Sequence, residues 1–248
     1  MNTPRIAIPE PTSFDPEYNG RALPQYLHAL KSAGATPILI PLHESPARVA
    51  KILSTTTGIL LPGSPADLEP EKYGQPRDPN AANPDTPREA VDELLLQDAF
   101  NLRKPILAIC YGCQAMNVWR NGNLIQHLTT SVNHRPGREI LNAHPARLAP
   151  ESLLAKLAVG ELVGDSVPVN SSHHQALLAP GDGLRVTATC PTDGTIEAVE
   201  LIEDRQFLLG IQWHPERSYQ ASPFSRRIFQ SFVSAAAEWL PEPPTENA

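Results

Sequence analysis

The chain has 248 residues, with 27 acidic against 20 basic side chains and a formal net charge of −7. An acidic balance of this kind argues against a cationic nucleic-acid surface. Apolar residues make up 41% of the chain, enough for a buried core, yet the sequence holds no run of about 18 apolar residues that would cross a bilayer. We therefore expect neither a nucleic-acid partner nor a membrane partner.

The start of the chain and its cysteine count indicate a cytoplasmic protein. Residues 1–11 carry one basic side chain before a short apolar run, which is unlike a secretory signal. Three cysteines are too few for a dense disulfide framework, and the odd number favours reduced thiols.

Short strand patterns alternate with helical patterns through the first half of the chain. Strands are predicted at residues 5–9, 36–41, 58–61 and 105–109, and helices at residues 23–33, 47–53, 86–100 and 115–119. A capping box of Thr86 and Glu89 is predicted to begin the third of these helices. The alternation predicts an α/β fold with a doubly wound, mainly parallel sheet.

The second half of the chain is richer in strand patterns. Additional β-strands are predicted at residues 137–148, 167–170, 184–190, 195–202 and 206–213. Ser222 and Pro223 then open a final amphipathic helix. We find no internal repeat or linker, so the prediction is a single domain over residues 1–248, with residues 241–248 as a flexible tail.

A proline-rich segment at residues 62–87 interrupts the pattern. It holds seven prolines, and a loop of this length inside a compact domain is usually functional or disordered. Tyr73 in this segment is a candidate wall of a substrate pocket, with anchoring of the loop as the alternative. Arg88 and Asp92, which follow it, have the i, i+4 spacing of an ordinary surface ion pair.

Cys110 stands where a buried strand gives way to a helix. Amides at a helix start lack partners and carry partial positive charge, so they are expected to stabilise a thiolate and lower its pKa. Gly112 would let neighbouring backbone pack closely. Two alternatives remain: Cys110 and Cys113 are small buried residues, or their Cys-x-x-Cys spacing belongs to a thiol redox protein.

A base and an oxyanion site can be placed beside this thiol. The strand predicted at residues 206–213 runs into His214 and Glu216, and alternate residues of a strand share a face, so Glu216 is expected to orient the His214 ring. Gly63 ends the third predicted strand, and its amide and that of Tyr111 are candidate oxyanion donors. The alternatives are a surface histidine and a plain Pro-Gly-Ser turn.

The order PGS…PILAICYGCQ…QWHPE resembles the class I glutamine amidotransferase family. More narrowly, it is similar to the gamma-glutamyl hydrolase branch, which includes bacterial gamma-glutamyl-gamma-aminobutyrate hydrolases. Residues 61–74 (LPGSPADLEPEKYG) and 169–176 (VNSSHHQA) are similar to two loops of that branch. The resemblance implies a flavodoxin-like class I glutaminase fold. It places the nucleophile, base and carboxylate at Cys110, His214 and Glu216, the oxyanion amides at Gly63 and Tyr111, and a substrate contact at Gln114. It also places the loop with His173, His174 and Gln175 near the active-site mouth, where these residues are candidate substrate contacts and loop hydrogen bonding is the alternative.

The activity implied is a cysteine-dependent hydrolysis of gamma-glutamyl amide bonds in small conjugates, through a glutamyl thioester. No cofactor and no metal are expected, and the family suggests a homodimer. A glutaminase subunit that passes ammonia to a synthase is the main alternative, ahead of the redox protein. A zinc site is not predicted, because the cysteine pair has no second pair at structural spacing. The remaining histidines have no partner spacing that assigns them a role: His28, His43, His127, His134 and His144.

Overall fold

The computed structural model describes residues 3–203 and 205–241, and a single large sheet forms its centre. One half of this sheet is parallel, built from β1 (Arg5–Pro9), β2 (Thr36–Ile40), β3 (Gly58–Leu61), β4 (Ile106–Ile109) and β11 (Leu208–Ile211). These strands lie in the order β2-β1-β3-β4-β11, which is the order of flavodoxin-like sheets. The predicted mainly parallel, doubly wound α/β sheet is confirmed.

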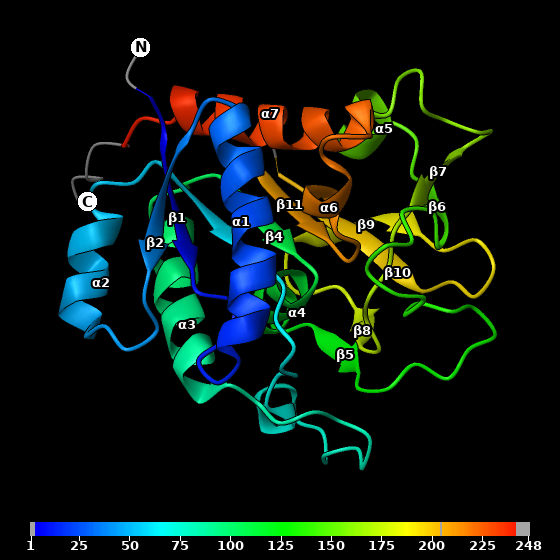
Figure 1. Cartoon of the computed structure of the whole chain (residues 1–248), viewed down its shortest axis with the longest axis horizontal. Helices are drawn as coiled ribbons and strands as arrows, with labels where there is room; N and C mark the ends of the chain where they lie inside the picture. Colours follow the sequence, from blue (N-terminus) through cyan, green and yellow to red (C-terminus); the bar gives the residue numbers. More distant parts are fainter. Residues whose placement is uncertain (1–2, 204, 242–248) are drawn as a thin grey trace, which may run out of the picture.

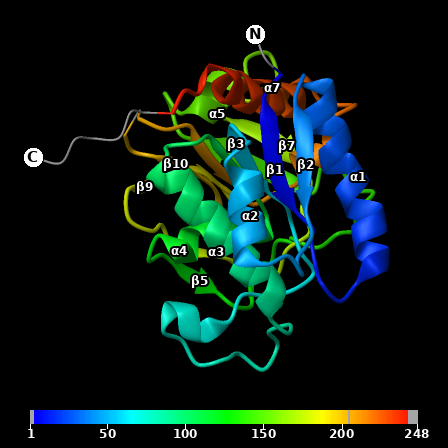
Figure 2. The same cartoon turned by 90° about the vertical axis from the view of Figure 1, so that its left-hand side faces the viewer.

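Helices cover both faces of the parallel strands (Figures 1 and 2). One face packs against α1 (Pro16–Ser32) and α7 (Pro223–Glu238). The other face packs against α2 (Pro46–Leu53), α3 (Thr86–Asn101) and α4 (Tyr111–Trp119). Because both faces are covered, β3 and β4 are continuous apolar runs in which every residue is buried.

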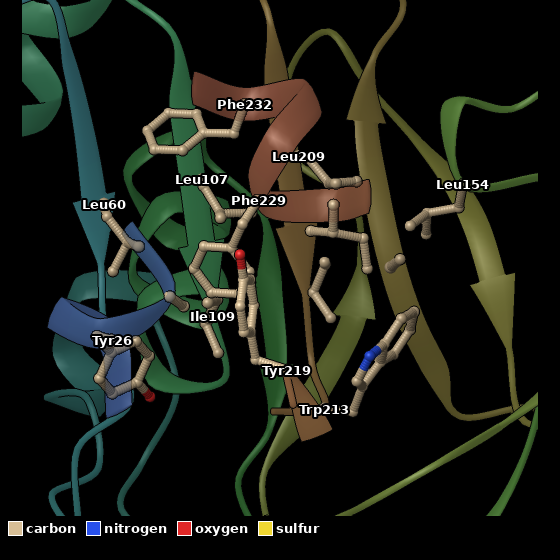
Figure 3. Packing of buried hydrophobic residues seen from close by; sticks show 14 of the residues in the cluster. Tyr26, Leu60, Leu107, Ile109, Leu154, Leu209, Trp213, Tyr219, Phe229 and Phe232 are labelled. Carbon is tan, nitrogen blue, oxygen red and sulfur yellow. The ribbon is translucent and has the colours of Figure 1, made fainter. Parts of the chain in front are cut away.

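The core therefore consists of two clusters separated by the sheet. Figure 3 shows the cluster beneath α1 and α7, in which Phe229 and Phe232 lie among Leu60 and Leu107 of the strands. Burying one such side chain contributes about 1.5–3 kcal/mol. The two clusters pack the helices against both faces of the sheet. Because β3, β4 and β11 are parallel neighbours, their carboxyl ends lie at one edge.

The second half of the sheet is antiparallel. It contains β5 (Asn123–Ile125), β6 (His144–Leu148), β7 (Ser166–Val169), β8 (Ala176–Ala179), β9 (Leu184–Thr189) and β10 (Ile196–Leu201). β10 joins it to the parallel half by pairing with β11. The strand predicted at residues 137–148 begins only at His144, and residues 137–143 form no strand. The sequence interpretation missed β5, β8 and the one-turn helix α5 (Leu153–Leu157), which are too short to show a period.

The start of α3 differs by one residue from the predicted capping box. Asp85, and not Thr86, caps the helix, and its carboxylate accepts the Arg88 amide. Glu89 accepts the amide of Glu69 in the proline-rich segment, 2.8 Å away. That segment also contains a short 3-10 helix, η1 (Pro70–Tyr73). Asp85 also accepts the amide of Ser13 at 2.7 Å, so both acidic side chains tie α3 to loops.

In the part of the chain that the structure describes, no helix is both long and apolar enough to cross a membrane. The tail predicted at residues 241–248 falls, except for Pro241, outside the described residues.

Candidate active site

Cys110 lies in the sharp turn between β4 and α4, where its backbone is forced into an uncommon conformation. Its φ is 54° and its ψ is −111°, a combination that residues other than glycine rarely adopt. A strained strand-to-helix turn of this kind projects a nucleophile above the sheet. Gly112 makes the turn possible, because a Cβ there would collide with the Leu61 carbonyl oxygen. The expected close packing at Gly112 is present.

The backbone at Gly63 lies against both Cys110 and the imidazole of His214. A Cβ placed on Gly63 would lie 3.0 Å from Cε1 of His214 and 3.5 Å from Cβ of Cys110. The three residues follow the carboxyl ends of β3, β4 and β11, which are neighbours in the sheet. Segments far apart in the sequence therefore meet at one edge, as the parallel order requires.

His214 and Glu216 form a close pair: Nδ1 of the ring lies 2.7 Å from Oε1 of the carboxylate. The reason given for this pair from sequence is wrong, since β11 ends at Ile211 and His214 caps a short helix, α6 (Pro215–Ser218). The turn, and not strand alternation, brings the carboxylate to the ring. Both side chains are buried, so the ring is held in one orientation.

Asn170, which follows β7, holds the backbone of His214. Its Oδ1 accepts the His214 amide at 2.9 Å, and its Nδ2 donates to the His214 carbonyl oxygen at 2.8 Å. Sequence reasoning gave Asn170 no role of its own. The signal available was the polar run that begins with it inside an otherwise apolar stretch.

Burial sets the protonation of the thiol and the ring. It raises the pKa of Cys110 to about 12, although Arg217 and the Tyr111 amide act to lower it. Burial, reinforced by Arg217, lowers the pKa of His214 to about 4 against the opposing charge of Glu216. The predicted lowering of the thiol pKa by the helix start is therefore wrong for the free protein, because loss of solvation outweighs it. Near neutral pH both groups are uncharged.

A cavity of about 320 Å³ lies beside the thiol. It is bounded by the proline-rich segment, the start of α4, and two loops of the antiparallel half. Its lining consists of residues 64–67, Asn80, Ala82, Cys110, Tyr111, Gln114, His127, Arg135 and residues 172–175. The predicted substrate contacts Gln114, His173, His174 and Gln175 are thus brought together with the thiol.

Tyr73 does not line this cavity. It is 8% exposed and packs in the cluster beneath α2, α3 and α4, which matches the anchoring alternative. Sequence reasoning missed Asp67 and Arg135, which bring a carboxylate and a guanidinium to the lining. Asp67 stands inside the loop motif already singled out, whereas nothing in the pattern around Arg135 marks it.

The two predicted oxyanion donors differ in their surroundings. The Tyr111 amide faces the sulfur of Cys110 and helps to lower its pKa. The Gly63 amide donates to the buried hydroxyl of Tyr26 in α1, 3.0 Å away. Only the first is therefore directed at the thiol in this structure.

Gln114 and Cys113 occupy different places on α4. The side-chain Nε2 of Gln114 donates to the backbone carbonyl oxygen of Gln175 at 3.0 Å and to Gln212 Oε1 at 3.1 Å. Its side chain is thereby fixed at the cavity wall. The Cys113 sulfur packs toward Gly210 of β11, where an added Cβ would lie 2.8 Å from it. Both cysteines are free thiols, and Cys113 occupies a packing position.

A family model for peptidase C26 matches residues 10–216 of the chain. The chain belongs to the peptidase C26 family. Among curated members, "Putative glutamine amidotransferase Rv2859c" of Mycobacterium tuberculosis is 36% identical over 216 residues, covering 86% of this chain and 66% of that protein. The gamma-glutamyl-gamma-aminobutyrate hydrolase PuuD of Escherichia coli K12 is 33% identical, covering 88% of this chain and 87% of the relative.

A solved structure from Thermoplasma acidophilum, described as a "putative gmp synthase subunit a protein", superposes with a TM-score of 0.62 over 96% of both chains. Its sequence is 13% identical, so it supports the class I glutamine amidotransferase fold alone. This peptidase C26 chain is therefore similar in sequence to amidotransferase-like proteins and to gamma-glutamyl hydrolases. Family and relatives together support a hydrolase.

Proposed function

We propose that the protein is a cysteine-dependent hydrolase of gamma-glutamyl amide bonds in small glutamyl conjugates. The observation that carries the proposal is the strained Cys110 at the end of β4 and the buried His214–Glu216 pair, since Cys110 and His214 both lie against Gly63. A nucleophile, a base and a residue that orients the base are the parts that acyl transfer through a thioester needs. The relative named as a gamma-glutamyl-gamma-aminobutyrate hydrolase supports the substrate class.

In the first step, Cys110 Sγ attacks the carbon of the substrate's side-chain amide. Since the free thiol and the ring are both neutral, His214 Nε2 takes the thiol proton as the carbon–sulfur bond forms. Glu216 accepts a hydrogen bond from Nδ1–H and stabilises the imidazolium. His214 then protonates the departing amine nitrogen, the carbon–nitrogen bond breaks, and a glutamyl thioester remains.

In the second step, water replaces the amine. His214 takes a proton from water as the oxygen attacks the thioester carbon, and returns it to the leaving sulfur. Glutamate and the Cys110 thiol are the products. No bound group is required for the proton balance of either step.

The developing oxyanion needs donors beside the thiol. The Tyr111 amide is the first of them, since it already faces Cys110. The Gly63 amide becomes the second when the substrate oxygen replaces the Tyr26 hydroxyl as its acceptor. A pre-existing bond to Tyr26 keeps that donor ordered, in a buried position, before the substrate arrives.

The charges of the cavity fit a glutamyl group. Arg135 brings a cation to the lining, suited to the substrate's α-carboxylate, and Asp67 brings a carboxylate suited to its α-ammonium group. Asp67 also accepts the Ala82 amide, and it lies 2.9 Å from Nε2 of His174. A volume of about 320 Å³ suits a glutamyl group with a small amine.

The test is a panel of gamma-glutamyl amines and free glutamine, assayed without a partner protein. We expect turnover of gamma-glutamyl amines, and a glutamyl adduct on Cys110 detected by mass spectrometry after acid quench. Cys110→Ala should lower kcat by at least about 10⁴-fold and remove the adduct, because it deletes the attacking atom.

Cys113→Ser is the matched control and should keep its activity, because Cys113 packs away from the cavity. Equal turnover by Cys110→Ala and the parent protein would overturn the proposal. Turnover of glutamine and of no gamma-glutamyl amine, with a rate that rises when a synthase is added in a separate assay, would favour the glutaminase subunit. Loss of activity in Cys113→Ser with retention in Cys110→Ala would favour a different use of the thiols.

A further inference from the structure

Four buried ligand-type side chains gather in the antiparallel half, directly behind the wall of the catalytic cavity. They are His134, His144, His173 and Glu197. His134 lies in the loop between β5 and β6, His144 begins β6, His173 lies between β7 and β8, and Glu197 lies in β10. One nitrogen or oxygen from each lies within 4.8 Å of the others.

The polar atoms at the centre of the cluster lack partners. Glu197 Oε1 lies 3.5 Å from His134 Nδ1, 3.5 Å from His144 Nε2 and 3.7 Å from His173 Nε2. None of these atoms, nor Glu197 Oε2, has a hydrogen-bond partner among the residues the structure describes. Glu197 itself is 0% exposed. A buried carboxylate left this way is strongly disfavoured, and a cation at the centre of the cluster would stabilise it.

The opposite nitrogen of each ring is held by a hydrogen-bond partner outside the cluster. His134 Nε2 lies 2.9 Å from Asp193 Oδ2, and His173 Nδ1 lies 2.9 Å from the Gln175 carbonyl oxygen. His144 Nδ1 lies 3.2 Å from the Pro145 carbonyl oxygen. A carbonyl or carboxylate on one nitrogen keeps the proton there and turns the lone pair of the other nitrogen inward. Metal-binding histidines are oriented in this way.

We infer that these four side chains bind one divalent transition-metal ion, and that zinc fits them best. Two ligands about 2.1 Å from a tetrahedral ion lie roughly 3.4 Å apart. Glu197 Oε1 lies at nearly that distance, 3.5–3.7 Å, from the three ring nitrogens, and all four ligand atoms lie within 4.8 Å of one another. Three imidazole nitrogens and one carboxylate oxygen form a donor set that suits zinc. Four ligands from the protein leave no open position, so the ion is structural and does not activate water.

A second group of candidate ligands shares His134 but is a weaker candidate for a metal site. It consists of His134, Cys190 and Asp193. The Asp193 carboxylate already accepts from the Thr130 hydroxyl and the Thr195 amide, in addition to contacting His134 Nε2. Its oxygens are satisfied where those of Glu197 are not. We therefore place Asp193 behind His134, as the residue that orients the ring.

The ion would order the loop at residues 170–175, which forms one wall of the catalytic cavity. His173 lines that cavity, and the Gln175 carbonyl oxygen that holds its ring also accepts from Gln114. The inference does not depend on the proposed reaction, since metal content is measured directly. His134 and His144, which sequence spacing left without a role, thereby gain one.

The first experiment measures metal in the tag-free full chain, purified without chelator from medium supplied with zinc. We expect about one zinc ion per chain by elemental analysis, as for a closed structural site. Chelator-stripped protein should take up Co²⁺ and develop the strong visible absorption of tetrahedral cobalt. A folded chain that contains no stoichiometric metal and takes up neither zinc nor Co²⁺ would overturn the inference.

Variants then locate the ion. His144→Ala and Glu197→Gln should lose it, whereas His43→Ala and Cys190→Ser should keep it. Asp193→Asn should weaken zinc affinity about 10–100-fold, because it removes the partner that orients His134. If the ligand variants fail to fold, the Co²⁺ spectrum of the parent protein and the Asp193→Asn affinity decide the matter. Zinc retained by both His144→Ala and Glu197→Gln, or lost from Cys190→Ser alone, would contradict the site.

Discussion

Cys110 and His214 are neighbours that are both uncharged in the free protein. Burial disfavours the Cys110 thiolate more than the Tyr111 amide and Arg217 stabilise it, and it also disfavours the His214 imidazolium. The thiol proton therefore moves only as the carbon–sulfur bond forms. At low pH, protonation of the His214 ring, and not loss of a preformed thiolate, is expected to limit the proposed reaction.

The pH dependence of kcat/KM tests this arrangement. Because the pKa of His214 is lowered to about 4, the ring stays neutral until the pH falls to that value, and protonation below it removes the base. We expect kcat/KM to fall about tenfold per pH unit below pH 4 and to be level above about pH 5. An acid limb near 6.5, the ordinary histidine value, would contradict the neutral pair.

Unfolding at low pH is the control for that profile. Enzyme held at each pH and returned to pH 7 should recover its activity if only His214 has titrated. Activity that does not return marks the points at which the fold has been lost, and these are left out of the comparison.

At the scale of elements, Arg88 joins α3 to two loops. Its Nη1 donates to the Pro11 carbonyl oxygen and its Nη2 to that of Pro62, each at 2.7 Å. Its Nε donates to Asp92 at 2.8 Å, and the guanidinium lies 4.9 Å from the centre of the Tyr111 ring. The ion pair predicted from the i, i+4 spacing is present, but its placement at the surface is wrong, because Arg88 is 0% and Asp92 is 2% exposed. This cation holds the loop that carries Gly63, the proposed oxyanion donor.

Removing Arg88 should be strongly destabilising. Arg88→Met leaves the Asp92 carboxylate buried without its cation, and we expect a loss of about 3–5 kcal/mol in unfolding free energy, measured by urea denaturation. The double variant Arg88→Met/Asp92→Leu should recover part of this loss, because it removes both charges.

Arg48→Met is the matched control, since Arg48 is exposed on α2, and it should change stability by less than about 0.5 kcal/mol. A loss from Arg88→Met no larger than that of the control would show that the buried pair contributes nothing. A double variant less stable than Arg88→Met would show that packing, and not the isolated charge, dominates.

At the scale of the whole molecule, the two halves of the sheet each supply part of the site. The parallel half carries Cys110 and His214. The antiparallel half supplies Asn170, whose side chain bonds both the amide and the carbonyl oxygen of His214. The position of the base thus depends on how β7 is placed, although β7 stands at the far end of the strand order. Asn170 is a positioning residue, with no contact to the reacting atoms.

Asn170→Ala should act on turnover more than on binding. A displacement of the ring by about 1 Å costs on the order of 10²-fold in rate, so kcat should fall by that order while KM changes little. Steady-state kinetics on a gamma-glutamyl amine measure both. A raised KM with unchanged kcat would instead place Asn170 in substrate binding, and an unfolded variant would be visible by circular dichroism.

The parts of the fold that could be predicted are those with a local signal. β3 and β4 are unbroken apolar runs, and Cys110 stands at a strand-to-helix boundary, so both the parallel sheet and the thiol could be placed from sequence. The environment of the thiol could not, because its pKa depends on burial by distant segments. The cluster around Glu197 gave no signal for the same reason, since its members come from four separate segments.

The positive φ of Cys110 is unfavourable for folding, yet the proposed reaction needs a cysteine at this position. Holding a side chain in that conformation costs about 1–3 kcal/mol, and glycine would relieve it. An exchange to glycine, which would remove the proposed nucleophile, thus also relaxes the chain. In a lineage without the proposed reaction, selection for stability alone would favour glycine at this position.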